Sequence, residues 1–351
     1  MKKIRVTVLS IGFVAGMMLA GCGAQQNAQS GAQPEPAAKA SSSASSQPAS
    51  SQTASPQAIS KLTLTDDLKR TVVLERRPER IVVLSPEMLE LMYAIGGTAA
   101  GRAEAAGIVP PKGAENVPVV GQMRQASLEQ VLALKPDLVI GQPVFHKDME
   151  QTLTASGIPV VFLKLGSLEE VHAKTELLGR ITGKEAEAQK ALAGLDSRVE
   201  QVLKKLPAEK PTFVNLNVTP GVVSIQRNDM AGLEIARKMN LVNVAEELPT
   251  DKPDASTLPY SLEKLIEKNP DYIFLIIHGS KEAGEKKIKT EMESNPAWSS
   301  LKAVQEKKVI VMPSELFLTN PGLKYDESMT YLGQLVYPDA YGQPQTAGKV
   351  Q

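Results

Sequence analysis

The sequence predicts an α/β fold of two similar lobes, each built on a central, mostly parallel sheet, with one long helix joining them. Three observations lead to this prediction. Buried apolar strands are followed by capped helices, one helix–strand unit occurs twice, and a long helical stretch separates the two copies. Alternation of strands and helices is typical of parallel sheets covered by helices.

The chain opens with an export signal at residues 1–21. Lys2, Lys3 and Arg5 precede an apolar run that is too short for a stable membrane span. The run closes at Leu19-Ala20-Gly21-Cys22, which resembles a bacterial lipobox, and Cys22 is the only cysteine in the chain. The resemblance implies cleavage before Cys22 and a lipid on its sulfur. The alternative is an ordinary signal peptide with a chance cysteine.

Residues 22–59 are almost entirely Ala, Ser, Gln, Pro and Gly after the cysteine. Such a composition cannot bury apolar area, so we expect a disordered leash between the lipid and the folded body. A leash of this kind suits a protein on the extracytoplasmic face of a single cell membrane, beneath the wall of a Gram-positive bacterium.

The folded body begins near Lys61 with a predicted hairpin around Asp66-Asp67. The run 81–84 reads as a buried parallel strand. Ser85-Pro86 then opens a helix through Ile95, because serine caps helices well and proline suits the first helical position.

An internal repeat follows. Ser127 begins a capped helix that leads through Pro136-Asp137 to an apolar strand, and Ser261 does the same through Pro270-Asp271. Two such units in register indicate two similar lobes, although chance similarity of generic units is the alternative.

A helical stretch from Leu168 to Leu206 lies between the units, and we expect Gly183 to divide it. The predicted organisation is an N-terminal lobe at 60–183, an interlobe helix at 184–206 and a C-terminal lobe at 207–345.

Charge and composition narrow the function. The 39 basic and 39 acidic residues give zero net charge, so nucleic acid is not an expected partner. The sequence contains no nucleophile elbow, metalloprotease motif or phosphate-binding glycine loop, so we predict that the protein is not an enzyme.

Several segments resemble the lipoprotein substrate-binding proteins of ABC importers with a single interlobe helix, which capture ferric siderophores, cobalamin or haem. They are Arg77 to Pro86, Val120-Gly121 with Ser127-Leu128-Glu129, Leu134 to Asp137, the Trp298 segment through Val309, and Leu332 to Pro338. The resemblance implies a ligand cleft between the lobes, a monomer, and delivery to a membrane permease. It also implies one docking carboxylate per lobe, which falls on Glu90 and Glu234.

Ligands of parallel sheets bind beyond the carboxyl ends of the strands. His278 directly follows the apolar run 272–277, His146 follows the matching run of the first lobe, and His172 lies on a predicted helix.

Met123, in the loop before Ser127, and His278 resemble the axial pair of the haem-binding lipoproteins of iron-regulated surface determinant systems. There a methionine and a histidine hold the iron from opposite lobes. Thioether and imidazole are standard haem ligands, so haem is the predicted ligand and His146 the alternative ligand residue.

The rival ligand is a ferric siderophore. Arg124, Arg227, Lys324 and Tyr260 are candidate contacts for haem propionates or for an anionic siderophore, so they do not discriminate. Aromatic residues make up only 4% of the chain, which disfavours cobalamin. An adhesive or structural lipoprotein, a further rival, would not need two equivalent lobes.

Overall fold

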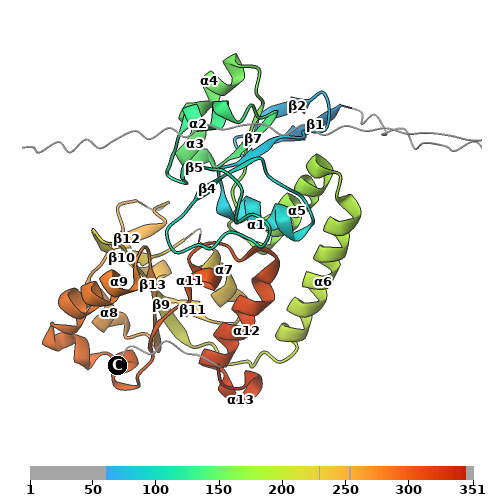
Figure 1. Cartoon of the computed structure of the whole chain (residues 1–351). Helices are drawn as coiled ribbons and strands as arrows, with labels where there is room; N and C mark the ends of the chain where they lie inside the picture. Colours follow the sequence, from blue (N-terminus) through green and yellow to red (C-terminus); the bar gives the residue numbers. More distant parts are fainter. Residues whose placement is uncertain (1–60, 229, 253, 345–351) are drawn as a thin grey trace, which may run out of the picture. The chain divides into compact units, whose positions relative to one another are not determined.

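The computed structural model describes residues 61–228, 230–252 and 254–344 (Figure 1). The predicted signal at 1–21, the lipidated Cys22 and the linker at 22–59 lie outside the described residues. Within the described ranges, no helix is long and apolar enough to cross a membrane.

The N-terminal part begins with the predicted hairpin, in which β1 (Leu62–Thr65) pairs antiparallel with β2 (Thr71–Leu74). A six-stranded sheet follows, in the order β6-β5-β4-β3-β7-β8. Its pairs are parallel except for β5 with β6. The strands are β3 (Ile81–Val83), β4 (Gly101–Glu104), β5 (Val119–Gln122), β6 (Gln125–Ala126), β7 (Leu138–Gly141) and β8 (Val160–Phe162).

Helices connect these strands as the sequence predicts. Ser85 caps the first one, its hydroxyl accepting the Met88 N–H at 3.4 Å. The helices here are α1 (Pro86–Ala94), α2 (Leu128–Ala133), α3 (Pro143–His146), the 3-10 turn η1 (Lys147–Met149) and α4 (Glu150–Ala155).

The C-terminal sheet is also six-stranded, in the order β12-β10-β9-β13-β14, with β11 pairing to β9. β9 pairs in parallel with β11 and β13, and β13 with β14, whereas β10 runs antiparallel to both β9 and β12. The strands are β9 (Thr212–Val218), β10 (Val223–Gln226), β11 (Val242–Asn243), β12 (Thr257–Pro259), β13 (Tyr272–Ile277) and β14 (Val309–Val311).

The helices of the C-terminal part include α12, which lies alongside the interlobe helix α6 (Figure 1). They are α7 (Ala231–Lys238), η2 (Val244–Glu247), α8 (Leu262–Lys268), α9 (Lys281–Ile288), the π-helical turn η3 (Lys289–Glu293), η4 (Pro296–Ser300), α10 (Lys302–Gln305), α11 (Ser314–Phe317), η5 (Gly322–Lys324), α12 (Tyr325–Val336) and α13 (Pro338–Tyr341).

The long helical stretch is divided where the sequence predicts. α5 (Leu168–Thr182) ends at Gly183, which has φ of 72°, a left-handed conformation that glycine adopts without steric cost. α6 (Glu185–Leu203) then joins the two sheets and ends before Pro207. The repeat is equally clear, since the hydroxyls of Ser127 and Ser261 cap α2 and α8 by accepting backbone N–H groups at 3.3 Å.

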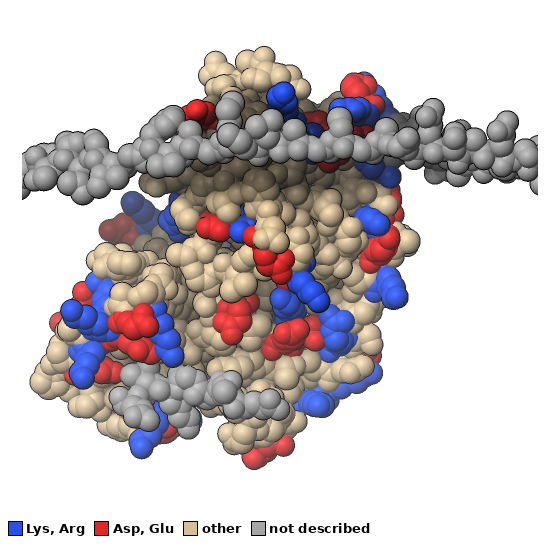
Figure 2. All heavy atoms as spheres, in the orientation of Figure 1, with Lys and Arg blue, Asp and Glu red and all other residues tan. Residues whose placement is uncertain are grey.

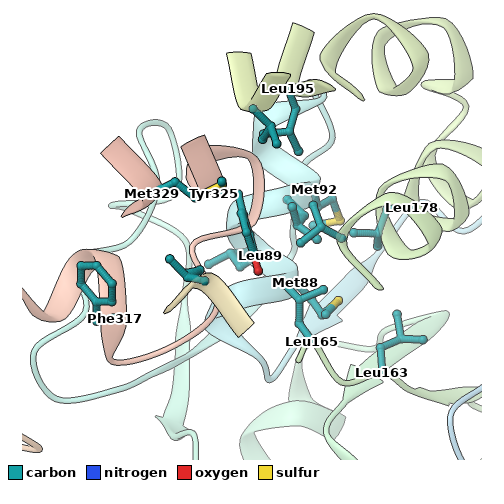
Figure 3. Packing of buried hydrophobic residues seen from close by; sticks show 14 of the residues in the cluster. Met88, Leu89, Met92, Leu163, Leu165, Leu178, Leu195, Phe317, Tyr325 and Met329 are labelled. Carbon is teal, nitrogen blue, oxygen red and sulfur yellow. The ribbon is translucent and has the colours of Figure 1, made fainter. Parts of the chain in front are cut away.

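The two lobes share one hydrophobic core. Residues alternate along each central strand, so that one face of each sheet packs into the shared cluster and the other face packs into a cluster of its own lobe. Figure 3 shows side chains from α1, α5, α6, α11 and α12 meeting there, among them Met92, Leu178, Leu195 and Tyr325. Because packed interiors resist deformation, this core limits how far the lobes can separate.

Candidate functional site

Met123 and His278 line the same cavity, which has a volume of about 400 Å³. Met123 lies in the turn between β5 and β6, and His278 is the first residue after β13. The cavity walls therefore come from both lobes, at the carboxyl ends of parallel strands. Both side chains are partly exposed, so each has a surface to offer to a ligand.

A larger cavity of about 600 Å³ adjoins the first one and shares Glu104, Ala105, Ile108 and Thr319 with it. Its remaining walls come from α1, the segment 107–112 after β4, and the residues around α11 and η5. The two cavities thus form one cleft between the lobes. Lys112 and Lys324 on its wall are exposed cations.

The turn that carries Met123 is held at two backbone atoms. The Met123 N–H donates to the Glu104 carbonyl at 2.6 Å, and the Met123 carbonyl lies 2.7 Å from Nε2 of His146. A carbonyl only accepts, so Nε2 of His146 carries a proton and donates it.

His146 therefore does not fit its predicted role as an alternative ligand. Its other nitrogen, Nδ1, accepts the Gln142 N–H at 2.9 Å, and the residue is only 1% exposed. The short helix α3 turns the ring back beneath the Met123 turn, so neither nitrogen has a lone pair that faces the cleft. Burial lowers the pKa of His146, which keeps the ring neutral.

His278 has a different environment. Its backbone N–H donates to the Val218 carbonyl at 2.8 Å, which continues the pairing of β13 with β9. Its ring Nε2 lies 3.1 Å from Oδ1 of Asn217. Burial, and secondarily the nearby charge of Arg124, lower the pKa of His278, so the ring is neutral and able to bind a metal.

Three buried amides behind His278 were not predicted from the sequence. Asn215 and Asn217 lie on β9 and Gln226 lies on β10, and their exposed fractions are 3%, 7% and 1%. A usable signal was present, because two asparagines interrupt the otherwise apolar run 213–218 at a spacing of two, which places them on one face of the strand.

The four candidate anion contacts divide into two groups. Arg124 lines the smaller cavity, with its guanidinium 5.0 Å from the Phe145 ring centroid, and Lys324 lines the larger one. Arg227 and Tyr260 line neither of these cavities. The structure therefore does not bring these two residues to the cleft that holds Met123 and His278.

Arg227 and Tyr260 lie away from the cleft for different physical reasons. Arg227 follows β10, which runs antiparallel to β9, so that strand ends at the edge of the sheet opposite to His278. Tyr260 packs against the outer cluster of the C-terminal lobe, and burial raises the pKa of its hydroxyl to about 12. His172 lies on α5, as expected, and pairs with Asp196 at 2.8 Å.

Glu87 on α1 is an acidic group inside the larger cavity. It accepts from Gln142 Nε2 at 2.7 Å and from the backbone of Asn320 in the other lobe, and it lies 3.3 Å from the Ser85 hydroxyl. Burial raises its pKa to about 7. No role for this residue was predicted from the sequence.

The two predicted docking carboxylates lie on α1 and α7 but differ in their contacts. Glu90 pairs with Lys324 at 2.7 Å. Glu234 accepts from the Tyr325 hydroxyl at 2.6 Å and from the Leu168 N–H at 2.9 Å, and it lies 3.6 Å from Lys238. Both carboxylates therefore meet the start of α12, and Glu234 is the more firmly held of the two.

Acidic and basic side chains are interspersed over the face in view in Figure 2. Among the described residues, no group of three or more His, Cys, Asp or Glu could hold a metal ion on its own.

A cleft walled by two α/β lobes defines the class of the molecule as a solute-binding protein.

The sequence profile described as "Periplasmic binding protein" matches residues 81–316, and the chain belongs to that family. Its members are solute carriers rather than enzymes, which confirms the predicted family and fold class and the absence of an enzymatic activity.

Curated relatives carry names that refer to iron compounds. The Fe(3+) dicitrate-binding protein FecB of Escherichia coli is 28% identical over 72% of this chain and 83% of its own length. The high-affinity heme uptake system protein IsdE of Staphylococcus aureus is 25% identical over 65% and 77%. The iron-uptake system-binding protein of Bacillus subtilis is 27% identical, and the match spans 54% of this chain and 59% of that relative.

Solved structures share the fold. IsdE of S. aureus complexed with heme has a TM-score of 0.63 at 22% identity and covers 74% of this chain and 98% of its own. S. aureus SirA complexed with staphyloferrin B has a TM-score of 0.64 at 21% identity and covers 78% and 98%.

Proposed function

We propose that this protein captures haem outside the cytoplasm and delivers it to an ABC importer for iron acquisition. The observation that carries the proposal is that Met123 and His278, one from each lobe, line a single cavity. Imidazole and thioether suit the two axial positions of haem iron. The haem-related name of IsdE agrees with this proposal.

The shape and charge of the cleft also suit haem. The smaller cavity adjoins one of about 600 Å³, which gives a porphyrin room to extend beyond the iron site. The cations Arg124 and Lys112 stand on its walls and are exposed, so they can pair with propionates. Lys324 is already paired with Glu90 and would have to exchange partners.

A haemin titration followed by visible absorption tests the proposal. We expect a low-spin spectrum for the wild type. His278→Ala should alter the spectrum most, and Met123→Ala should chiefly alter the ferrous form, because thioether is a soft ligand. His172→Ala is the matched control, because that ring lies on α5 and pairs with Asp196 on α6 instead of lining the cleft. An unchanged spectrum in the His278→Ala, Met123→Ala double variant would contradict the axial assignment.

A ferric siderophore or ferric citrate is the second candidate ligand. Arg124 and Lys112 could pair with carboxylates of such a chelate. The name of FecB and the staphyloferrin B bound to SirA support this alternative. Wild-type protein that binds no haemin but binds ferric citrate in a calorimetric titration would favour it.

Membrane attachment through Cys22 completes the proposal. Conversion of Cys22 to Ala should leave the protein without acyl groups and release it into the medium. A wild-type protein of unmodified mass, or a Cys22→Ala variant that stays with the membrane, would contradict the anchor.

Docking to the permease is assigned to Glu90 and Glu234, the carboxylates on α1 and α7. Reversing both charges should abolish uptake. Glu90 also lines the larger cavity and pairs with Lys324, so the haemin affinity of the same variant is measured to separate a docking defect from a binding defect. Normal uptake by the double variant would rule out this assignment.

A further inference from the structure

The hydrogen bond between His278 and Asn217 determines where the imidazole keeps its lone pair. Gln226 Nε2 donates to Asn217 Oδ1 at 2.5 Å, and Nε2 of His278 lies 3.1 Å from the same oxygen. An amide oxygen only accepts, so Nε2 of the neutral ring must carry the proton. The lone pair is therefore left on the other ring nitrogen, Nδ1.

Asn217 is in turn hydrogen-bonded to a chain of two further amides. Its oxygen accepts from Gln226, and Oε1 of Gln226 accepts from Asn215 Nδ2 at 3.2 Å. Asn215 and Gln226 are directly opposite each other in the antiparallel pair of β9 and β10. The three amides form a chain along the sheet that ends at His278.

This chain is costly to the fold. All three amides are at least nine-tenths buried, and Oδ1 of Asn215 has no hydrogen-bond partner among the described residues. A buried polar atom without a hydrogen-bond partner destabilises the folded state. Apolar side chains at these strand positions would avoid that cost. We therefore look for a role of the three amides beyond packing.

We propose that Asn217, oriented by Gln226 and Asn215, is the positioning residue that fixes the ring orientation and tautomer of His278 for iron binding. This inference rests on the proposed haem function. Metal-binding histidines generally donate their second N–H to a fixed acceptor, which sets the tautomer and raises the basicity of the ligand nitrogen. Here the acceptor is a neutral amide.

The first test uses the ligand-free protein. The chain has three histidines, so ¹⁵N-histidine labelling gives three rings, and His278→Ala identifies the relevant signals. At mildly alkaline pH we expect His278 as the Nε2–H tautomer. In Asn217→Leu, which removes the acceptor, the Nδ1–H tautomer should appear. His146 is the internal control, because its Nε2–H bond to Met123 is independent of Asn217. An unchanged His278 tautomer in Asn217→Leu overturns the proposal.

The second test measures haemin. Asn217→Leu should weaken haemin binding roughly 10- to 100-fold, the usual effect of losing such a partner. The loss should vanish when His278→Ala is already present, which separates positioning from a general effect on folding. Asn217→Asp keeps an acceptor and adds charge, so it should retain the tautomer and lower the reduction potential of bound haem. Asn217→Asp also replaces Asn217→Leu as the test variant if the leucine variant fails to fold.

The outcomes separate the two hypotheses. If wild-type protein binds no haemin, the proposed function fails, while the tautomer measurement still decides the role of Asn217. If haemin binds through His278 but Asn217→Leu changes neither tautomer nor affinity, the positioning role fails and the proposed function stands.

Discussion

In the N-terminal lobe the histidine after β7 supports a loop, whereas in the C-terminal lobe the histidine after β13 faces a cavity. His146 uses both ring nitrogens, one for Gln142 and one for Met123, and is 1% exposed. His278 uses one nitrogen for Asn217 and borders the cleft. Similar positions in a repeated unit therefore carry different chemistry, and an uncommitted lone pair distinguishes a candidate ligand from a structural residue.

The carboxylates on the first helix of each lobe show the same divergence. Glu90 forms an ion pair with Lys324, whereas Glu234 accepts from both Tyr325 and Leu168. Three residues before Glu90 stands Glu87, but three residues before Glu234 stands Ala231. The lobes share a fold while each has its own polar groups at the cleft.

The comparison of the histidines predicts the largest effect. His278→Ala should reduce haemin affinity by more than roughly 100-fold, because the loss of an inner ligand should exceed the 10- to 100-fold cost of losing an outer partner. His146→Ala should reduce it less and leave the nitrogen-ligand features of the spectrum intact. Equal losses in the two variants would show that the distinction between the two histidines is wrong.

The stability of the same two variants should rank in the opposite order. His146→Ala leaves the Gln142 N–H and the Met123 carbonyl without their partners and should lower the free energy of unfolding by roughly 1–3 kcal/mol. His146→Gln, whose side-chain amide keeps a donor and an acceptor, should recover part of that loss. Urea denaturation measures both, with His172→Ala as control. Full stability of His146→Ala would refute its role as a support.

Much of this arrangement could be predicted from the sequence, because it depends on local signals. Ser85, Ser127 and Ser261 cap helices as predicted, and Gly183 divides the long helical stretch. Local sequence patterns do not predict whether a strand runs parallel or antiparallel to its neighbour. The antiparallel β10 sends Arg227 away from the cleft, although it looks like a suitable anion contact in the sequence.

The sequence also could not predict whether a histidine after a strand would face the cleft or support a loop. The role of the histidine depends on which acceptor lies near its ring, and that acceptor comes from a distant part of the sequence. Asn217 lies 61 positions from His278 in the chain, and Met123 lies 23 positions from His146. Haem ligation by Met123 and His278 stays a prediction, as do the lipid on Cys22 and the docking role of Glu90 and Glu234.

Glu87 gives the N-terminal lobe a pH dependence that Ala231 cannot give the other. Its pKa is raised from 4.5 to about 7, so the folded state favours the protonated form. Its contribution to stability is full below pH 4.5 and is lost as pH rises through 7. Glu87→Gln should therefore exceed the wild type in stability by on the order of 3 kcal/mol above pH 7, and match it at acidic pH. Parallel pH profiles for the two proteins would contradict the shifted pKa.

The smallest effect distinguishes the two helix carboxylates. Glu234→Gln weakens charge-assisted bonds to the Leu168 N–H and to Tyr325, a fully buried residue, and should cost about 1 kcal/mol of unfolding free energy. Glu90→Gln breaks a pair whose Lys324 side chain is 53% exposed, so solvent screens it and the change should stay within about 0.5 kcal/mol. Thermal or urea unfolding in low and high salt resolves the difference. If Glu90→Gln costs as much as Glu234→Gln, then Glu90 contributes to the junction with α12 as strongly as its counterpart. If its effect stays small, its carboxylate remains available to an external cation without loss to the fold.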